Sequence, residues 1–85
     1  MKVLKFYADW CQPCKMISTM IEQAKDTIKT PIENVNIDSE DNISLCKSYG
    51  IRGVPTMILL DDEGKEVRRH VGMATDKQLK TFFGE

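Results

Sequence analysis

Two cysteines separated by two residues are the part of this 85-residue chain best suited to chemistry. Cys11 and Cys14 flank Gln12 and Pro13, and they follow a short apolar segment. Two thiols one helical turn apart can close a disulfide with little movement of the chain. A helix that begins at Cys11 favours the thiolate there, through its free N–H groups and its macrodipole. The spacing therefore predicts a site for thiol–disulfide exchange.

The alternative for the same spacing is an inert thiol pair or half of a zinc site. Zinc needs further sulfur or imidazole ligands, and the sequence offers only Cys46 and His70 besides the pair. Neither of them stands at a ligand-type spacing, so we expect no metal site. We interpret Cys46 as a half-buried packing thiol and His70 as a solvated strand residue.

Length and composition fit a single domain over residues 1–85. A formal net charge of −1 gives no indication of nucleic acid or an anionic membrane as the main partner. No apolar run approaches the roughly 20 residues of a transmembrane helix, and the N-terminal residues lack the pattern of a signal peptide. Three cysteines are the wrong number for the disulfide framework of a secreted domain. We therefore expect a cytoplasmic protein.

The helices that must position the cysteines can be predicted from apolar spacing. Apolar residues three and four apart predict a helix from residue 11 to about residue 28, which Pro31 stops. A shorter helix is expected over residues 42–49, with Ser39 as its cap and Gly50 at its end. A last helix is expected after its cap, Thr75, with Leu79, Phe82 and Phe83 on its apolar face.

Strands are predicted over residues 2–8, 33–37, 56–60 and 65–71. The segment over 56–60 is continuously apolar, which is typical of a strand covered on both faces. The run Asp61 to Gly64 is a turn signal, so the last two strands form a hairpin. The order β-α-β-α-β-β-α predicts an α/β fold with a four-stranded mixed sheet flanked by three helices.

The chain resembles the thioredoxin family at four places. Ala8–Ile17 is close to the family's W-C-G-P-C-K active-site segment, and Val35–Asp38 looks like its central strand. Tyr49–Thr56 is similar to the Y-x-I-x-x-x-P-T stretch that holds a cis-proline, and Val71–Met73 is like the glycine-bearing end of the last strand. The four segments span nearly the whole chain in the right order. The resemblance implies a thioredoxin-like fold.

The same resemblance implies a role for each residue of the active-site segment. Cys11 is the expected nucleophile that attacks a target disulfide, and Cys14 is expected to resolve the mixed disulfide that results. Gln12 and Pro13 are expected to tune the reduction potential. No cofactor is implied, because the dithiol itself is the redox centre.

A substrate-binding surface is also implied. Trp10 is expected beside the site as a flat apolar contact for target chains, with a packing role as the alternative. Pro55, cis by resemblance, is expected to present the backbone of Val54 to an extended target that pairs in a β-like manner. Gly72 is assigned to the same surface, and Asp9 is interpreted as a surface charge that shapes the choice of partner.

Several residues depart from the family pattern. The first strand begins at Lys2, so the family's usual first strand and helix are missing. Gln12 stands where glycine is usual, and Tyr7 where tryptophan is common. Lys5 occupies the place of a buried aspartate. One interpretation puts its ammonium under the site, where it stabilises thiolates, has a lowered pKa and exchanges protons with Cys14. The other is a lysine whose head reaches water while its stem packs.

We therefore expect a monomeric protein-disulfide reductase of thioredoxin type. By resemblance, a flavin-dependent thioredoxin reductase supplies its electrons, and ribonucleotide reductase is an example of its disulfide-containing targets. One alternative is a glutaredoxin-like protein recharged by glutathione, although glutaredoxins tend to carry an aromatic residue between the cysteines. Another is a thioredoxin-fold binding subunit whose thiols are incidental, which the intact Cys11 and Cys14 argue against.

Overall fold

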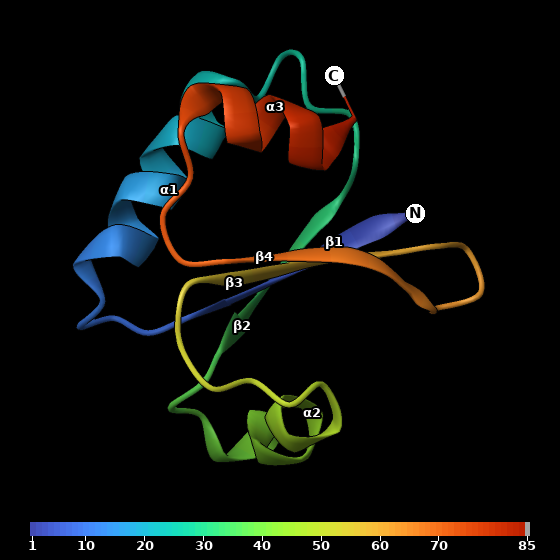
Figure 1. The fold of residues 1–85 in the computed structure, drawn as a ribbon. Coiled ribbons are helices and arrows are strands. Elements are labelled where there is room, and N and C mark those ends of the chain that lie inside the picture. Colours follow the sequence, from blue (N-terminus) through green and yellow to red (C-terminus); the bar gives the residue numbers. More distant parts are fainter. Residues whose placement is uncertain (85) are drawn as a thin grey trace.

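The computed structural model describes residues 1–84 of the chain. Eight elements follow one another: β1 (Lys2–Tyr7), α1 (Gln12–Gln23), β2 (Ile32–Asn36), the 3₁₀ turn η1 (Glu40–Asn42), α2 (Ile43–Ser48), β3 (Thr56–Leu60), β4 (Glu66–Val71) and α3 (Asp76–Phe83). Figure 1 shows the strands as one twisted sheet, with α1 and α3 on one face and α2 on the other. Among the described residues, no helix has both the length and the apolar composition that crossing a membrane requires.

The sheet is mixed, in the order β2-β1-β3-β4. Strand β1 pairs with β2 in parallel and with β3 in antiparallel, and β3 pairs with β4 in antiparallel. The parallel pair needs a crossover, which α1 supplies, while a short turn joins the antiparallel hairpin. The predicted four-stranded mixed sheet with three helices is confirmed.

Two apolar layers hold the helices against the sheet. Every residue of β3 is buried, as its continuous apolar sequence predicts. Alternate residues of the two central strands point to opposite faces. The layer under α1 and α3 contains Val3, Ile17, Met57, Leu59, Ala74, Leu79, Phe82 and Phe83. The layer under α2 contains Leu4, Phe6, Val35, Ile58 and Leu60.

Helix α1 is shorter than predicted. It ends at Gln23 rather than near residue 28, well before Pro31. The N–H groups of Thr27 and Ile28 both donate to the carbonyl of Ala24, and the Thr27 hydroxyl donates to it as well, at 2.9 Å. Such local bonds compete with the helical pattern. Ile28 still packs against the core, so its apolar spacing predicted its burial correctly and its helicity wrongly.

The other boundaries differ by smaller amounts. The predicted helix over 42–49 is a 3₁₀ turn followed by α2, and Ser39 makes no hydrogen bond as a side-chain cap. Gly50 does follow the helix end, with a φ of 63° that favours glycine. Strand β1 stops at Tyr7 rather than at residue 8. Strand β2 lies one residue earlier than predicted, and β4 begins one residue later.

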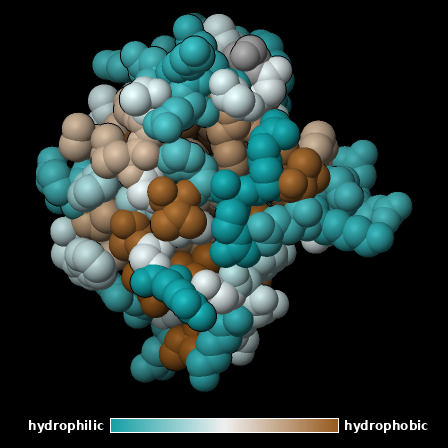
Figure 2. Space-filling view, viewed as in Figure 1, coloured by the Kyte–Doolittle hydropathy of each residue, from teal (hydrophilic) through white to brown (hydrophobic). Residues whose placement is uncertain are grey.

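The sheet leaves β4 as an open edge. The exposed apolar residues include Val67 and Val71 on this strand and Met73 just after it. Figure 2, in which β4 runs in front, shows brown apolar residues at the surface at the level of the sheet. Charged residues interrupt this apolar edge, because Arg68 and Arg69 lie between the two valines.

Helix α3 begins with a complete capping box. The Thr75 hydroxyl accepts from the backbone N–H of Gln78 at 3.1 Å, and the Gln78 side chain accepts from the N–H of Thr75 at 2.8 Å. Two N–H groups that the helix leaves free are satisfied in this way. The predicted cap at Thr75 is therefore confirmed.

Thr75→Ala is expected to lower the free energy of unfolding by about 1 kcal/mol, because the N–H of Gln78 loses its acceptor. Urea unfolding of the native chain and the variant measures the difference. Ser39→Ala is the matched control, since Ser39 stands at a cap position without a side-chain cap bond. Equal losses in the two variants contradict the assignment.

Candidate active site

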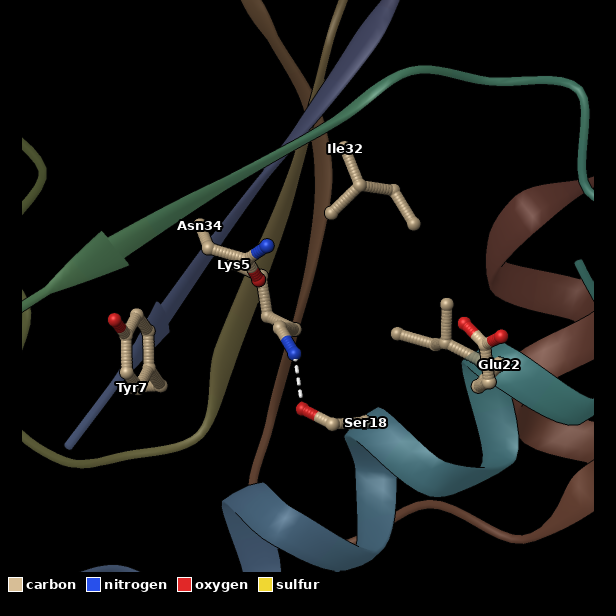
Figure 3. A pocket seen from close by; sticks show the side chains of 7 residues that line it. Lys5, Tyr7, Ser18, Glu22, Ile32 and Asn34 are labelled. Carbon is tan, nitrogen blue, oxygen red and sulfur yellow. Dashed lines mark hydrogen bonds between the residues drawn. The ribbon is translucent and has the colours of Figure 1, made fainter. Parts of the chain in front are cut away.

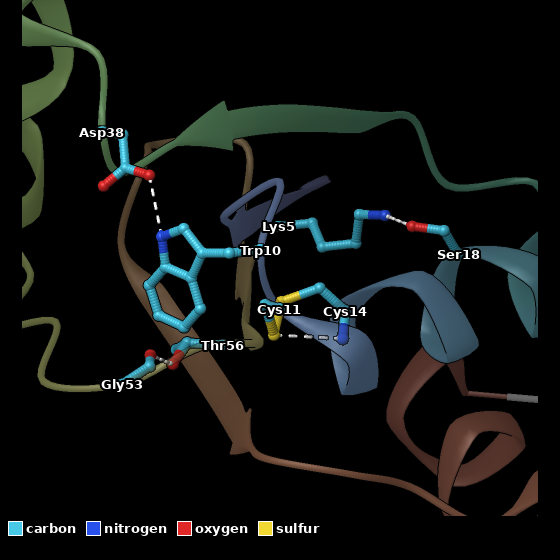
Figure 4. The surroundings of a disulfide bond; sticks show 8 residues. All are labelled: Lys5, Trp10, Cys11, Cys14, Ser18, Asp38, Gly53 and Thr56. Atoms are coloured by element: carbon cyan, nitrogen blue, oxygen red, sulfur yellow. Dashed lines mark hydrogen bonds between the residues drawn. A yellow bond between two sulfur atoms is a disulfide. The ribbon is translucent and has the colours of Figure 1, made fainter.

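Cys11 and Cys14 form a disulfide at the start of α1, with their Cα atoms 5.3 Å apart. Cys11 is the N-cap residue, and the backbone N–H of Cys14 donates to its sulfur at 3.2 Å. Figure 4 shows this bond beside the disulfide. Both residues are only 3% exposed. The sulfur of Cys11 thus receives one of the N–H groups that a helix N-terminus leaves free, which is the environment that favours a thiolate.

Gln12 and Pro13 form the first turn between the two cysteines. Gln12 is exposed, as expected, and Pro13 is half-buried. Proline suits the first positions of a helix, because the N–H that it lacks has no partner within the helix there. The turn is therefore stiffened without loss of a helical hydrogen bond.

Trp10 lies at the surface beside the disulfide, with 69% of its area exposed. Its indole N–H donates to a carboxylate oxygen of Asp38 at 2.9 Å (Figure 4). This exposure does not fit a packing tryptophan. The sequence reasoning missed Asp38, although a signal existed: Asp38 follows β2, and the carboxyl ends of the parallel strands β1 and β2 lie at the same edge of the sheet.

A groove of about 580 Å³ begins at Trp10. It runs between the active-site loop and α2, and Val54 lies in its wall. Its two charged lining residues are Lys47 and Arg52, both exposed. The lining residues are Trp10, Ile37, Ile43, Cys46, Lys47, Ile51, Arg52, Gly53 and Val54. An apolar groove with a few polar groups is a typical binding site.

The segment before β3 borders this groove. The peptide bond between Val54 and Pro55 is cis, and Pro55 is buried. The Thr56 hydroxyl donates to the carbonyl of Gly53 at 2.7 Å, and the N–H of Gly72 donates to the carbonyl of Pro55 at 2.8 Å. Gly72 thus contacts Pro55 and is not among the residues that line the groove.

Lys5 lies in the sheet under α1, and only 6% of the residue is exposed. Its ammonium donates a hydrogen bond to the Ser18 hydroxyl, as Figures 3 and 4 show. Burial lowers the pKa of Lys5 from its usual value of 10.5. The ammonium therefore lies under α1, where it donates to a protein hydroxyl in the wall of an open pocket.

Two adjoining cavities lie between Lys5 and Cys14. One, of about 410 Å³, is lined by Lys5, Tyr7, Ser18, Ile21, Glu22, Ile32 and Asn34 (Figure 3). The other, of about 470 Å³, is lined by Tyr7, Ala8, Asp9, Cys14, Lys15 and Ser18. The two share Tyr7 and Ser18. The sequence reasoning missed Ser18, yet its position four residues after Cys14 places both on one face of α1.

Cys46 and His70 lie apart from this arrangement. Cys46 is half-buried on α2, where it packs against the apolar layer. His70 is half-buried on β4, and its Nε2 lies 2.8 Å from the carbonyl oxygen of Met73, so it is less solvated than expected. Within residues 1–84, no three His, Cys, Asp or Glu side chains are grouped as metal ligands.

Lys5→Met is expected to stabilise the oxidised protein by about 1 kcal/mol at neutral pH, because it removes the cost of burying an ammonium. Between the lowered pKa of Lys5 and 10.5, the unfolded chain binds more protons than the folded one. The stability of the native chain therefore rises with pH in this window, and the advantage of the variant shrinks.

Denaturant unfolding of both proteins from neutral to alkaline pH measures this difference. Lys2→Met is the comparison, since it removes an exposed ammonium from the same strand. A stability difference between the native chain and Lys5→Met that stays constant up to pH 10.5 rules out the buried charge as its cause.

Comparisons with known proteins agree with this geometry. The sequence model of the thioredoxin family matches residues 1–85. The thioredoxin of Chlamydia caviae is 40% identical, with 91% of this chain and 74% of that protein covered. Thioredoxin Y1, chloroplastic, of Arabidopsis thaliana is 36% identical over 91% of this chain, which spans 44% of that relative's length.

Among solved structures, a mutant thioredoxin from Halobacterium salinarum is similar, with a TM-score of 0.82 and 34% identity. The match covers 95% of this chain and 69% of that one. The family match extends over the whole sequence, and a CxxC pair stands at disulfide distance at the start of a helix. The chain therefore belongs to the thioredoxin family and carries the redox pair of a thiol–disulfide oxidoreductase.

Proposed function

We propose that residues 1–85 act as one thioredoxin-like domain that reduces disulfides in other proteins. The observation that carries this proposal is the bond from the Cys14 N–H to the Cys11 sulfur at the N-terminus of α1. A donor in that place stabilises negative charge on sulfur, and the thiolate is the form that attacks. The groove beside the pair supplies room for a target chain.

The reaction takes two exchange steps. The Cys11 thiolate attacks one sulfur of the target disulfide, a bond between Cys11 and the target forms, and the other target sulfur leaves and takes a proton. Cys14 then loses its proton and attacks the Cys11 sulfur, which releases the second target sulfur. The target gains two electrons and two protons, and the Cys11–Cys14 disulfide remains.

The neighbouring residues have supporting roles in this proposal. Gln12 and Pro13 tune the reduction potential through the turn that joins the two sulfurs. Trp10 offers an exposed apolar face to the target, and the backbone of Val54 pairs with an extended target segment next to Pro55. Gly72 supports this segment through its bond to the Pro55 carbonyl.

The proposed partners follow from the family. A thioredoxin reductase returns electrons to the pair, and the targets are proteins with accessible disulfides, ribonucleotide reductase being one candidate. The chain acts as a monomer, with its groove free for the target. The cytoplasm is the proposed compartment, because a pair that must be reduced again for each turnover needs a reducing environment.

Cys11→Ser is expected to abolish reduction of a protein disulfide such as that of insulin, because the thiol that attacks the target is lost. Cys14→Ser is expected to stop after the first step, with the target joined to Cys11. Cys46→Ser is added to both variants, so that one sulfur alone can react. Mass spectrometry of the adduct identifies the sulfur that carries the target.

The two electron donors are compared in the same assay. Turnover of the native chain with NADPH and thioredoxin reductase, and little with glutathione, agrees with the proposal. Efficient turnover with glutathione alone favours the glutaredoxin-like alternative. An insulin disulfide that stays intact with either donor, and no adduct with Cys14→Ser, refutes the exchange function.

Trp10→Ala is expected to raise KM for a protein disulfide about tenfold with kcat little changed, since it removes an apolar contact made before and during reaction. Reduction of a small soluble disulfide, which does not reach the groove, is expected to change little. Val67→Ala is the matched control, because Val67 is an exposed apolar residue on β4. If Trp10→Ala lowers kcat/KM equally for the protein disulfide and the small disulfide, Trp10 maintains the structure of the site and does not bind the target.

A further inference from the structure

We propose that Ser18 positions the Lys5 ammonium behind Cys14, and that this pair stabilises the Cys14 thiolate when it resolves the mixed disulfide. The inference rests on the proposed function, in which Cys14 attacks Cys11. It assigns Ser18 as a positioning residue, and it gives Lys5 an electrostatic role in which the amine keeps its proton.

The contacts place the charge on the inner side of the active site. Lys5 lies in a central strand with its side chain on the α1 face, and its ammonium ends on the Ser18 hydroxyl. Ser18 follows Cys14 by four residues on the same helix face, and both line one cavity. Figure 4 shows the Lys5 side chain extending on the α1 side of the disulfide toward Ser18.

Cys14 needs such a charge, because the residue is 3% exposed and burial disfavours its thiolate. Cys11 receives an N–H donor at the helix N-terminus, whereas Cys14 lies inside the first turn and itself supplies that donor. A buried thiol with no hydrogen-bond donor or positive charge nearby stays protonated, and a protonated thiol does not attack a disulfide. A positive charge in the adjoining cavity, which shares Tyr7 and Ser18 with the cavity at Cys14, offsets the cost of ionising Cys14.

Other charged and titratable groups face these cavities and set the background. Glu22 and Tyr7 line the cavity at Lys5, while Asp9 and Lys15 line the cavity at Cys14. Glu22 is exposed and pairs with Lys25 at 3.1 Å. Within residues 1–84, no carboxylate lies within ion-pair distance of the Lys5 ammonium. The positive charge of Lys5 is therefore not cancelled by a direct partner.

The step balances without a further reactant. Cys14 releases its proton to solvent and its thiolate attacks the Cys11 sulfur. The new bond joins Cys11 and Cys14, and the bond between Cys11 and the target breaks. Its electron pair leaves with the target sulfur, which takes up a proton. The target is reduced and the dithiol is oxidised, while Lys5 and Ser18 are unchanged.

The test measures the ionisation of Cys14 directly. In a Cys11→Ser, Cys46→Ser background, Cys14 is the one remaining thiol, and its rate of alkylation by iodoacetamide against pH gives its pKa. Lys5→Met is expected to raise this pKa by about 1 unit, since an opposite charge nearby is lost. Ser18→Ala is expected to raise it by a smaller amount, because the ammonium loses the group that holds it.

Further variants separate positioning from general damage. Lys5→Met with Ser18→Ala is expected to match Lys5→Met alone, since Ser18 acts through Lys5. Lys5→Arg, which keeps the charge, is expected to restore most of the native profile. Lys2→Met and Thr19→Ala are controls that remove an exposed ammonium from β1 and an exposed hydroxyl from α1. Circular dichroism of each variant establishes that it is folded.

An unchanged alkylation profile in folded Lys5→Met overturns the inference. Equal and additive shifts from Lys5→Met and Ser18→Ala overturn the positioning role of Ser18. Should Lys5→Met fail to fold, Lys5→Arg and Ser18→Ala decide the question alone. The result is independent of target reduction, because the assay reads a thiol and not turnover. A native chain that does not reduce a protein disulfide refutes the proposed function. If Lys5→Met still shifts the pKa of Cys14, the electrostatic role of Lys5 and Ser18 stands.

Discussion

The pairing of β1 with strands on both of its sides is the constraint on which the rest of the structure depends. Because β2 and β3 cover its two edges, β1 is held in a fixed register through the middle of the sheet. Its end delivers Cys11 to the first turn of α1, and the parallel end of β2 delivers Asp38 to Trp10. The cavity below the pair and the groove beside it both form where these ends meet. The loop that carries Trp10 and Cys11 is thus positioned by a strand that is paired along both of its edges.

A second consequence is that a charged residue lies in a place where apolar residues are expected. Val3 and Met57 are buried on the same face of the sheet as Lys5, and the face is covered by α1. Burying an ammonium costs stability. The Ser18 hydroxyl accepts one N–H of the Lys5 ammonium. The other two N–H groups face an open cavity that can hold water. Sites that cost stability in this way are frequently those that serve chemistry.

Much of the fold could be predicted because local sequence and tertiary structure agree. The buried run of β3, the hairpin and the cap at Thr75 follow from period, turn residues and capping chemistry. The failures lie where side chains bond to nearby backbone. Thr27 ends α1 through Ala24, and Asn42 donates to the Asn36 carbonyl at 2.9 Å in the turn before α2. Periodicity carries no information about such bonds, so it predicted the burial of Ile28 and not the helix end.

By itself, the sequence determined the reactive pair and the elements around it. Two cysteines after a strand and before a helix can be recognised from residue types and spacing, because both are local properties of the chain. Only the tertiary structure decided what faces that pair. The bond between Lys5 and Ser18 joins a strand to a helix, and that between Trp10 and Asp38 joins two separate loops. Such contacts depend on how strands register and helices pack, which no short stretch of sequence specifies.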